Sequence, residues 1–114
     1  MSTDNERRRH QRYDLRLPIK LHRGDEVLEA NILNASKSGC LLLCSTPLEP
    51  GGHIETSIPE LSLPQTRLHV VRCQSTPMGY TIAAYFEAAA ADETAIARLA
   101  DEQKAELAHL RWLN

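Results

Sequence analysis

Four arginines within six residues near the start of the chain are the side chains best suited to chemistry. They are Arg7, Arg8, Arg9 and Arg12, with His10 and Gln11 between the last two. A guanidinium group presents planar, paired N–H donors that match phosphate oxygens and also the O6 and N7 acceptors of guanine. The run therefore suits a ligand that carries both groups. Taken alone, such a run is more often a solvated basic tail or a nonspecific contact with a polyanion.

A second candidate segment is residues 34–39, a polar interval between two predicted strands. The side chains of Asn34 and Ser36 can hydrogen-bond a ligand or their own backbone. Gly39 permits either the positive φ of a tight turn or a close approach of two backbones. Considered alone, this segment is an ordinary polar turn and indicates no particular function.

Six short segments have the apolar pattern of β-strands and would position these two candidates. They are residues 17–22, 27–33, 40–44, 53–58, 68–73 and 80–86. Apolar and polar side chains alternate along the first segment, as a half-buried strand requires, and Pro18 indicates that this strand starts at a sheet edge. A hairpin turn is predicted at residues 23–25, and prolines and glycines separate the later segments. The number and spacing of the strands predict an antiparallel barrel or sandwich.

The N-terminal segment differs in kind from this middle part. Residues 1–14 contain one large apolar side chain after the initiator Met1, that of Tyr13. Such a segment has little to bury, so we predict a flexible arm over residues 1–14 and one domain over residues 15–114.

The C-terminal segment has the pattern of a helix. Asp92 is a predicted N-cap, and apolar residues then recur at helical spacing. These residues are Ile96, Leu99, Leu107, Leu110 and Leu113. Asp101 is a candidate break that would divide the helix in two. We expect the helix to pack on its own barrel, with Trp112 folded over it, rather than to present its apolar face to a partner.

Length and charge limit the classes of function. A chain of 114 residues suits one domain, and its formal net charge is −2. Residues 1–23 hold seven basic and three acidic side chains, a balance of +4, and the remaining residues sum to −6. This asymmetry indicates an anion-binding N-terminal segment on an acidic body. It argues against a surface built throughout for nucleic acid.

The remaining reactive side chains indicate neither a metal site nor an active site. Cys40, Cys44 and Cys73 form no Cys-x-x-Cys pair, and there is no signal peptide or membrane-length apolar run. We therefore predict reduced thiols in a cytoplasmic protein. The five histidines lack metal-ligand spacing, and no Ser-His-Asp set, Gly-x-Ser-x-Gly or P-loop is present. We predict no metal, no cofactor and no enzymatic activity.

Considered together, the two candidate segments resemble the signature motifs of the PilZ domain family. Arg8-x-x-x-Arg12 precedes the first strand, as in that family. Asn34-x-Ser36-x-x-Gly39 follows the second strand, again as in the family. Each motif is short, but their joint occurrence in this order is specific. The resemblance implies a mainly β fold, a six-stranded antiparallel barrel with a flexible arm and a C-terminal α-helix.

The same resemblance implies that the ligand is cyclic di-GMP. Arg8 and Arg12 would clasp its guanine edges and phosphates. Asn34 and Ser36 would hydrogen-bond a base from the barrel surface, and Gly39 would shape the loop. The chemistry would be a bidentate reading of guanine joined to neutralisation of a dianion.

Further positions are assigned from the resemblance in the same way. Arg7 and Arg9 would assist, and an arginine at position 7 implies two stacked ligand molecules per chain. One departure from relatives is at residues 83–86, where alanine stands in place of the glycine that often precedes the aromatic residue. A second is at Val71 and Arg72, where some relatives place an aromatic ring beneath a guanine. Arg72 would stack there by its planar face, or, as is more common for a strand arginine, pair with a surface carboxylate.

Three functional hypotheses follow. The first is a receptor or adaptor that changes conformation on binding the second messenger and signals in trans to an unidentified effector protein, in motility or biofilm formation. The alternative is a PilZ-like scaffold for pilus or motility machinery that does not bind ligand, although the presence of both motifs counts against it. A third hypothesis, a small RNA- or DNA-binding barrel, is disfavoured by the few aromatic residues and the acidic body. We predict no nucleic-acid partner and no membrane insertion.

Overall fold

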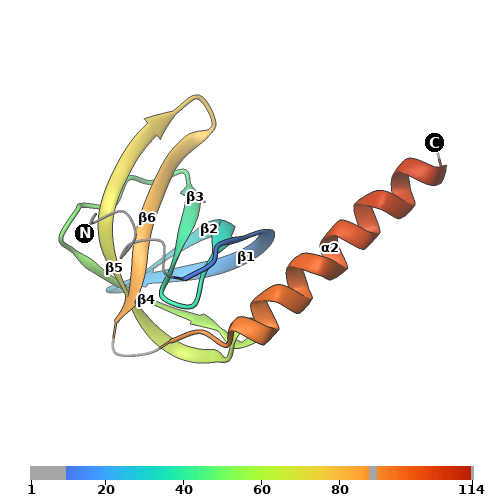
Figure 1. Cartoon of the computed structure of the whole chain (residues 1–114). Helices are drawn as coiled ribbons and strands as arrows, with labels where there is room; N and C mark the ends of the chain where they lie inside the picture. The colour runs from blue at the N-terminus through green and yellow to red at the C-terminus, as the bar shows by residue number, and fades with distance from the viewer. Residues whose placement is uncertain (1–9, 88–89, 114) are drawn as a thin grey trace, which may run out of the picture.

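The structure, a computed structural model, describes residues 10–87 and 90–113, and for residues 110–113 it describes the backbone alone. Its elements in chain order are β1 (Tyr13–Arg23), β2 (Glu26–Ala35), β3 (Gly39–Cys44), β4 (His53–Ile58), a short 3-10 helix η1 (Pro59–Leu61), β5 (Leu63–Thr76), β6 (Gly79–Glu87) and α2 (Glu93–Leu113). The six strands form a closed barrel in the order β1-β2-β3-β6-β5-β4, and every neighbouring pair is antiparallel. The predicted barrel with a C-terminal helix is confirmed (Figure 1).

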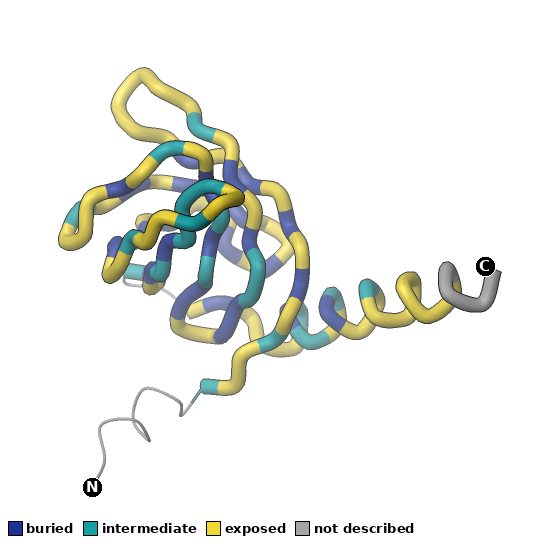
Figure 2. Tube along the Cα trace, turned by 90° about the horizontal axis from the view of Figure 1, so that it is seen from above, coloured by how far each residue is buried: buried dark blue, intermediate teal, exposed yellow. Residues whose placement is uncertain are grey.

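Alternation of apolar and polar side chains builds the core of the barrel. In β1, the side chains of Leu15, Leu17, Ile19 and Leu21 are buried, and the residues between them are exposed. Figure 2 shows buried and exposed positions alternating along the strands. Because successive side chains in a strand point to opposite faces, one set fills the interior and the other forms the outer surface. Each large aliphatic side chain that is fully buried contributes roughly 1.5–3 kcal/mol.

β1 begins four residues earlier than the alternation around Leu17 predicts. Its first residue is Tyr13, because Leu15 continues the buried face and Tyr13 itself packs against the core. The last two residues of the segment predicted as an arm therefore belong to the barrel.

β5 is also longer than predicted, at 14 residues. Beyond Cys73 its side chains are exposed or half-buried, so the sequence has no apolar alternation there. These residues are held by pairing with β6 as far as the turn at Gly79. Backbone hydrogen bonding thus extends the hairpin where side-chain burial does not.

β1 and β4 pair over two positions only, Leu21 and His22 of β1. The neighbouring part of β1, residues 16–20, is called the seam. The hydroxyl group of Thr56, in β4, donates a 2.7 Å hydrogen bond to the carbonyl oxygen of Lys20, which belongs to the seam. Pro18 has no backbone N–H group, so no donor at this position is left without a partner. Proline is suited to an edge position for this reason.

Gln103 of α2 binds the other end of the seam. Its side-chain Oε1 accepts a hydrogen bond from the backbone N–H of Arg16, and its Nε2 donates one to the carbonyl oxygen of Arg16, each at 2.7 Å. The amide side chain therefore satisfies both backbone groups of one strand residue, as a neighbouring strand would. These bonds join α2 to the barrel.

The start of α2 follows the sequence prediction. Asp92 Oδ1 accepts hydrogen bonds from the backbone N–H groups of Thr94 at 2.9 Å and Ala95 at 3.3 Å, which is N-capping. Ile96 and Ala100 are then buried against the rest of the molecule. The first turns of the helix therefore pack on the barrel as expected.

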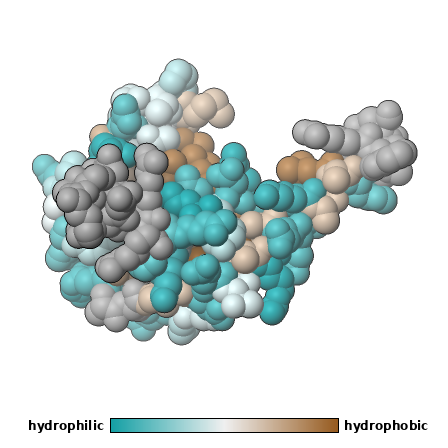
Figure 3. All heavy atoms as spheres, in the orientation of Figure 1, coloured by the Kyte–Doolittle hydropathy of each residue, from teal (hydrophilic) through white to brown (hydrophobic). Residues whose placement is uncertain are grey.

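The rest of α2 corrects two expectations. The helix continues through Asp101 without a break, because aspartate in a helix interior costs well under 1 kcal/mol. The helix then projects away from the barrel, so the side chain of Leu107 is 62% exposed and the expected packing of the whole apolar stripe is wrong at this position (Figures 1 and 3). The expectation for Trp112 falls on a side chain outside those described. No helix in the described part of the chain is long and apolar enough to cross a membrane.

Candidate functional site

The two predicted motifs meet at Arg12 and Asn34. Arg12 lies just before β1, and Asn34 lies near the end of β2, where the pairing aligns it with Asp14. The Nη1 group of Arg12 donates a hydrogen bond to Asn34 Oδ1 at 3.2 Å. Residues 7–9 lie outside the described part of the chain, so the roles of Arg7, Arg8 and Arg9 stay predictions.

The loop after Asn34 is organised around the hydroxyl group of Ser36. This oxygen accepts hydrogen bonds from the backbone N–H groups of Ser38 at 3.2 Å and Gly39 at 3.3 Å. The backbone N–H of Ser36 donates to the carbonyl oxygen of Gly39 at 2.8 Å, which closes the turn. Ser36 is 3% exposed. In this conformation its hydroxyl group holds the loop together, and its predicted bond to a base stays a prediction.

Two neighbouring segments fix the position of this loop. The backbone N–H of Phe86, in β6, donates to the carbonyl oxygen of Ser38 at 2.9 Å. The backbone N–H of Ala91, in the segment that leads into α2, donates to the carbonyl oxygen of Lys37 at 2.9 Å. The loop is therefore attached both to the sheet and to the approach to the helix.

Gly39 is required by a close approach of β3 and β6. A Cβ atom at this position would collide with the carbonyl oxygen of Ala84 and lie 3.0 Å from Tyr85 Cα. Of the two reasons predicted for a glycine here, close backbone approach is the one that the structure has. Gly39 is itself buried and is paired with Tyr85 of β6.

An open cavity of about 600 Å³ lies on the outer surface at this point. Arg12, Gly39 and Arg72 line it, so the structure brings together three residues that were predicted from distant parts of the chain. Val71, noted with Arg72 as a departure from relatives, lines it as well and is 55% exposed. Tyr85, which is 45% exposed, also lines it and was missed as a binding residue. The signal for Tyr85 was the alternation along β6, which sends the side chains on either side of it inward and therefore sends Tyr85 outward.

Arg72 does not pair with a carboxylate among the described residues. The ion pairs found there join Arg23 to Glu26 at 3.0 Å and Arg67 to Glu55 at 3.5 Å. The cavity therefore has two guanidinium groups on its walls, those of Arg12 and Arg72, and neither forms an ion pair with another described residue.

The thiol group next to this site, that of Cys40, is in its unreactive neutral form. Cys40 is 1% exposed, and burial raises the pKa of its thiol to about 12, although the charge of Arg12 acts in the opposite direction. The thiol is therefore neutral at physiological pH, as expected of a residue in the hydrophobic core. In the part of the chain that is described, no three His, Cys, Asp or Glu side chains are grouped to hold a metal ion.

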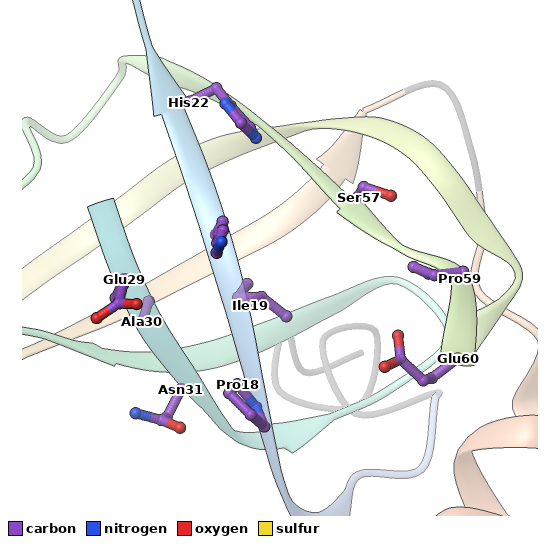
Figure 4. A pocket seen from close by; sticks show the side chains of 10 residues that line it. Pro18, Ile19, His22, Glu29, Ala30, Asn31, Ser57, Pro59 and Glu60 are labelled. Atoms are coloured by element: carbon purple, nitrogen blue, oxygen red, sulfur yellow. The ribbon is translucent and has the colours of Figure 1, made fainter. Parts of the chain in front are cut away.

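A second cavity, of about 450 Å³, lies beside β1 (Figure 4). Glu29 and Asn31 lie on one side of β1 in this view, and Ser57 and Glu60 on the other. Its charged side chains are of both signs, and none of the residues predicted to bind ligand lines it. An anionic ligand is better matched by the cavity at Arg12 and Arg72.

Comparison with known proteins finds a similar fold and identifies the family. One solved structure that the chain resembles is that of the Bacillus subtilis inhibitor of motility (MotI/DgrA), with a TM-score of 0.64 and 18% sequence identity. The alignment covers 88% of this chain and 52% of that one, so the chain spans about half the length of that protein. No curated protein matches the chain. The family model of the PilZ domain matches residues 6–102, which include both motifs and all six strands, and the chain therefore belongs to the PilZ domain family.

Proposed function

We propose that this PilZ domain is a receptor for cyclic di-GMP that signals to a partner protein. The observation that carries the proposal is the hydrogen bond between Arg12 and Asn34 at the edge of the cavity that Arg72 also lines. It joins the arginine motif and the loop motif at one place on the outer surface. PilZ domains are receptor and adaptor domains rather than enzymes.

The chemistry of the cavity supports this ligand. Cyclic di-GMP carries two phosphates and two guanines, and a guanidinium group can neutralise the first and read the O6 and N7 edge of the second. Each well-formed pair of this kind contributes about 1–3 kcal/mol. Arg8 would add a second guanidinium group from the arm, with Arg7 and Arg9 as assisting residues.

Signalling would follow from ordering of the arm. Binding of the dianion removes the mutual repulsion of the arginines, so the arm would adopt one conformation over the cavity. We place the protein in the cytoplasm, where a nucleotide second messenger acts, and its effector partner in the same compartment. Motility and biofilm formation are the processes we assign to it.

A scaffold role in motility without ligand is the second candidate. It is favoured by the similarity of the fold to a protein described as an inhibitor of motility. The guanidinium groups of Arg12 and Arg72 on the cavity walls count against it, because a scaffold has no need for anion recognition at this site.

The experiment is calorimetric titration with cyclic di-GMP, GTP, cyclic AMP and a single-stranded oligonucleotide. We expect tight binding of cyclic di-GMP alone and near loss of binding in Arg12→Ala. Arg23→Ala is the matched control, because Arg23 is an exposed arginine at the end of β1 that lies farther from Arg12. Equal affinity for GTP, or no heat with cyclic di-GMP, contradicts the receptor assignment. Tight binding of the oligonucleotide would favour a nucleic-acid partner instead.

A further inference from the structure

Three aromatic rings on neighbouring strands form a ladder on the outer surface of the barrel. His53 of β4 is paired directly with His69 of β5, and His69 is paired with Tyr85 of β6. The ring centroids of His53 and His69 are 5.0 Å apart, with an angle of 45° between the rings. Those of His69 and Tyr85 are 4.7 Å apart, and their planes differ by 21°, so these two rings are stacked.

The ladder stops at the cavity. The residue paired with Tyr85 on its other side is Gly39 of β3, which has no side chain. One face of the Tyr85 ring is covered by His69, so the opposite face is directed across the sheet toward Gly39, which lines the same cavity. Tyr85 is 45% exposed and lines the cavity there. A planar group placed above Gly39 would continue the same stack as a fourth ring.

We propose that one guanine base of the ligand stacks on the face of Tyr85 opposite His69, above Gly39. The proposal rests on the cyclic di-GMP receptor assignment and adds the surface against which the base lies. In this arrangement Tyr85 is a ligand-contacting residue, and His69 is a positioning residue that supports the Tyr85 ring from behind. The base plane would lie parallel to the plane of the Tyr85 ring, and its edge would point into the cavity that Arg12 and Arg72 line.

The division of work between these groups follows from their chemistry. Stacking on an aromatic ring favours any base, because every base has a π-face. The guanidinium groups add discrimination, because they match the O6 and N7 acceptors of guanine. Val71, which is 55% exposed in the same cavity, offers apolar surface to the ligand. Tyr85 would therefore add affinity for any base, and Arg12 and Arg72 would add both charge neutralisation and the choice of guanine.

The test compares Tyr85→Ala with Tyr85→Phe. Loss of one base–aromatic stack is expected to weaken cyclic di-GMP binding by about tenfold or more in Tyr85→Ala, whereas Tyr85→Phe should retain it. His69→Ala should cause a smaller loss. Met78→Ala is the control, because Met78 is 78% exposed at the tip of the same hairpin, away from the cavity. Thermal unfolding of each variant identifies any that fails to fold, and Tyr85→Leu then replaces Tyr85→Ala.

A second measurement reports the stack directly. The guanine H8 proton should shift upfield in the NMR spectrum on binding, since it would lie over the Tyr85 ring. The shift should persist in Tyr85→Phe, decrease in His69→Ala and disappear in Tyr85→Ala. Binding by a folded Tyr85→Ala variant with unchanged affinity and an unchanged H8 shift would overturn the stacking proposal alone. No binding by the unmodified protein would overturn the receptor assignment and this proposal with it.

Discussion

The hydroxyl group of Tyr13 donates a hydrogen bond to Glu93 Oε2 at 3.2 Å and so joins the first residue of β1 to the first residue of α2. Tyr13 directly follows Arg12, which binds Asn34. The start of the helix and the edge of the cavity are thus held by consecutive residues. A change in the position of Arg12 on ligand binding would act directly on this contact.

This contact predicts a dependence of stability on alkaline pH. Desolvation, followed by the hydrogen bond and the negative charge of Glu93 and the charge of Asp101, raises the pKa of Tyr13 above its usual 10.0. A raised pKa means that the fold favours the neutral hydroxyl group. The stabilisation is therefore complete below pH 10.0 and is lost as the pH rises through the higher pKa of the folded protein.

Urea unfolding of the unmodified protein and of Tyr13→Phe, from pH 7 to pH 11, measures this effect. The unmodified protein should be the more stable at neutral pH, and its advantage should shrink above the ordinary tyrosine pKa of ~10. Glu93→Gln is the control that keeps an acceptor and removes its charge. A stability difference that stays constant across the whole range would contradict the assigned coupling.

Replacing Gln103 tests how α2 is joined to the barrel. Gln103→Ala removes both hydrogen bonds to the backbone of Arg16, and the expected loss of unfolding free energy is about 1–2 kcal/mol. Urea unfolding followed by circular dichroism provides the measurement. The neighbouring exposed residue supplies the control, Glu102→Ala, which should change stability by less than about 0.5 kcal/mol. Equal effects of the two substitutions would show that the bonds to Arg16 do not hold the helix.

Replacing Gly39 tests the close approach of β3 to β6. A methyl group at this position would collide with the carbonyl oxygen of Ala84, so Gly39→Ala should destabilise the protein by about 1–3 kcal/mol. It should also weaken ligand binding, because the two strands border the cavity. Lys37→Ala, an exposed side chain in the same loop, should have neither effect. An unchanged melting temperature for Gly39→Ala would contradict the packing argument.

The three thiols should differ in reactivity. Cys40 and Cys44 are buried, whereas Cys73 is half-buried. Since the pKa of Cys40 is about 12, an aromatic disulfide reagent at pH 8 should modify one thiol in the folded protein and three after denaturation. Cys73→Ser should abolish the early reaction. Rapid modification of Cys40 in that variant would show that the barrel opens more readily than its packing indicates.

The presence of arginine at position 7 predicts how many ligand molecules bind to each chain. An additional guanidinium group can stack on a second guanine pair and offset its phosphate charge, so we expect two cyclic di-GMP molecules per chain. Arg7→Leu should reduce the calorimetric molar ratio to one without abolishing binding. Native mass spectrometry gives the count independently. A ratio of one for the unmodified protein would remove the special role of Arg7 and leave the receptor assignment intact.

The barrel was predictable because its strands bury alternate residues. In β1, Leu17, Ile19 and Leu21 follow that rule, and the turn and cap residues mark where strands and helix begin. The outer part of β5 was not predictable, because exposed residues are held there by cross-strand hydrogen bonds alone. The projection of α2 was missed for a related reason. Helical periodicity identifies the apolar stripe, but it does not show where the barrel surface beneath that stripe ends.

The two motifs of the site could be predicted from the sequence, but the surface that they border could not. Arg12 and Asn34 were recognisable by residue type and spacing, whereas Tyr85 becomes relevant only when β6 is placed between β5 and β3. That order of strands is a long-range property of the barrel, so no local pattern reveals that Tyr85 lies beside Gly39. Arg72 was noted from the sequence, yet its place in the same cavity as Arg12 also depends on the order of strands in the sheet.

Gln103 has a consequence for how this protein meets other chains. An unpaired strand border is a template on which a neighbouring molecule can add its own strand, and this is a common start of aggregation. Thr56, Pro18 and Gln103 together leave the seam with little to offer such a strand. Pro18 and Thr56 belong to strands of the barrel, whereas Gln103 belongs to α2. We therefore expect α2 to hinder strand addition at Arg16, and any partner that pulls α2 away would expose the backbone of Arg16 to it.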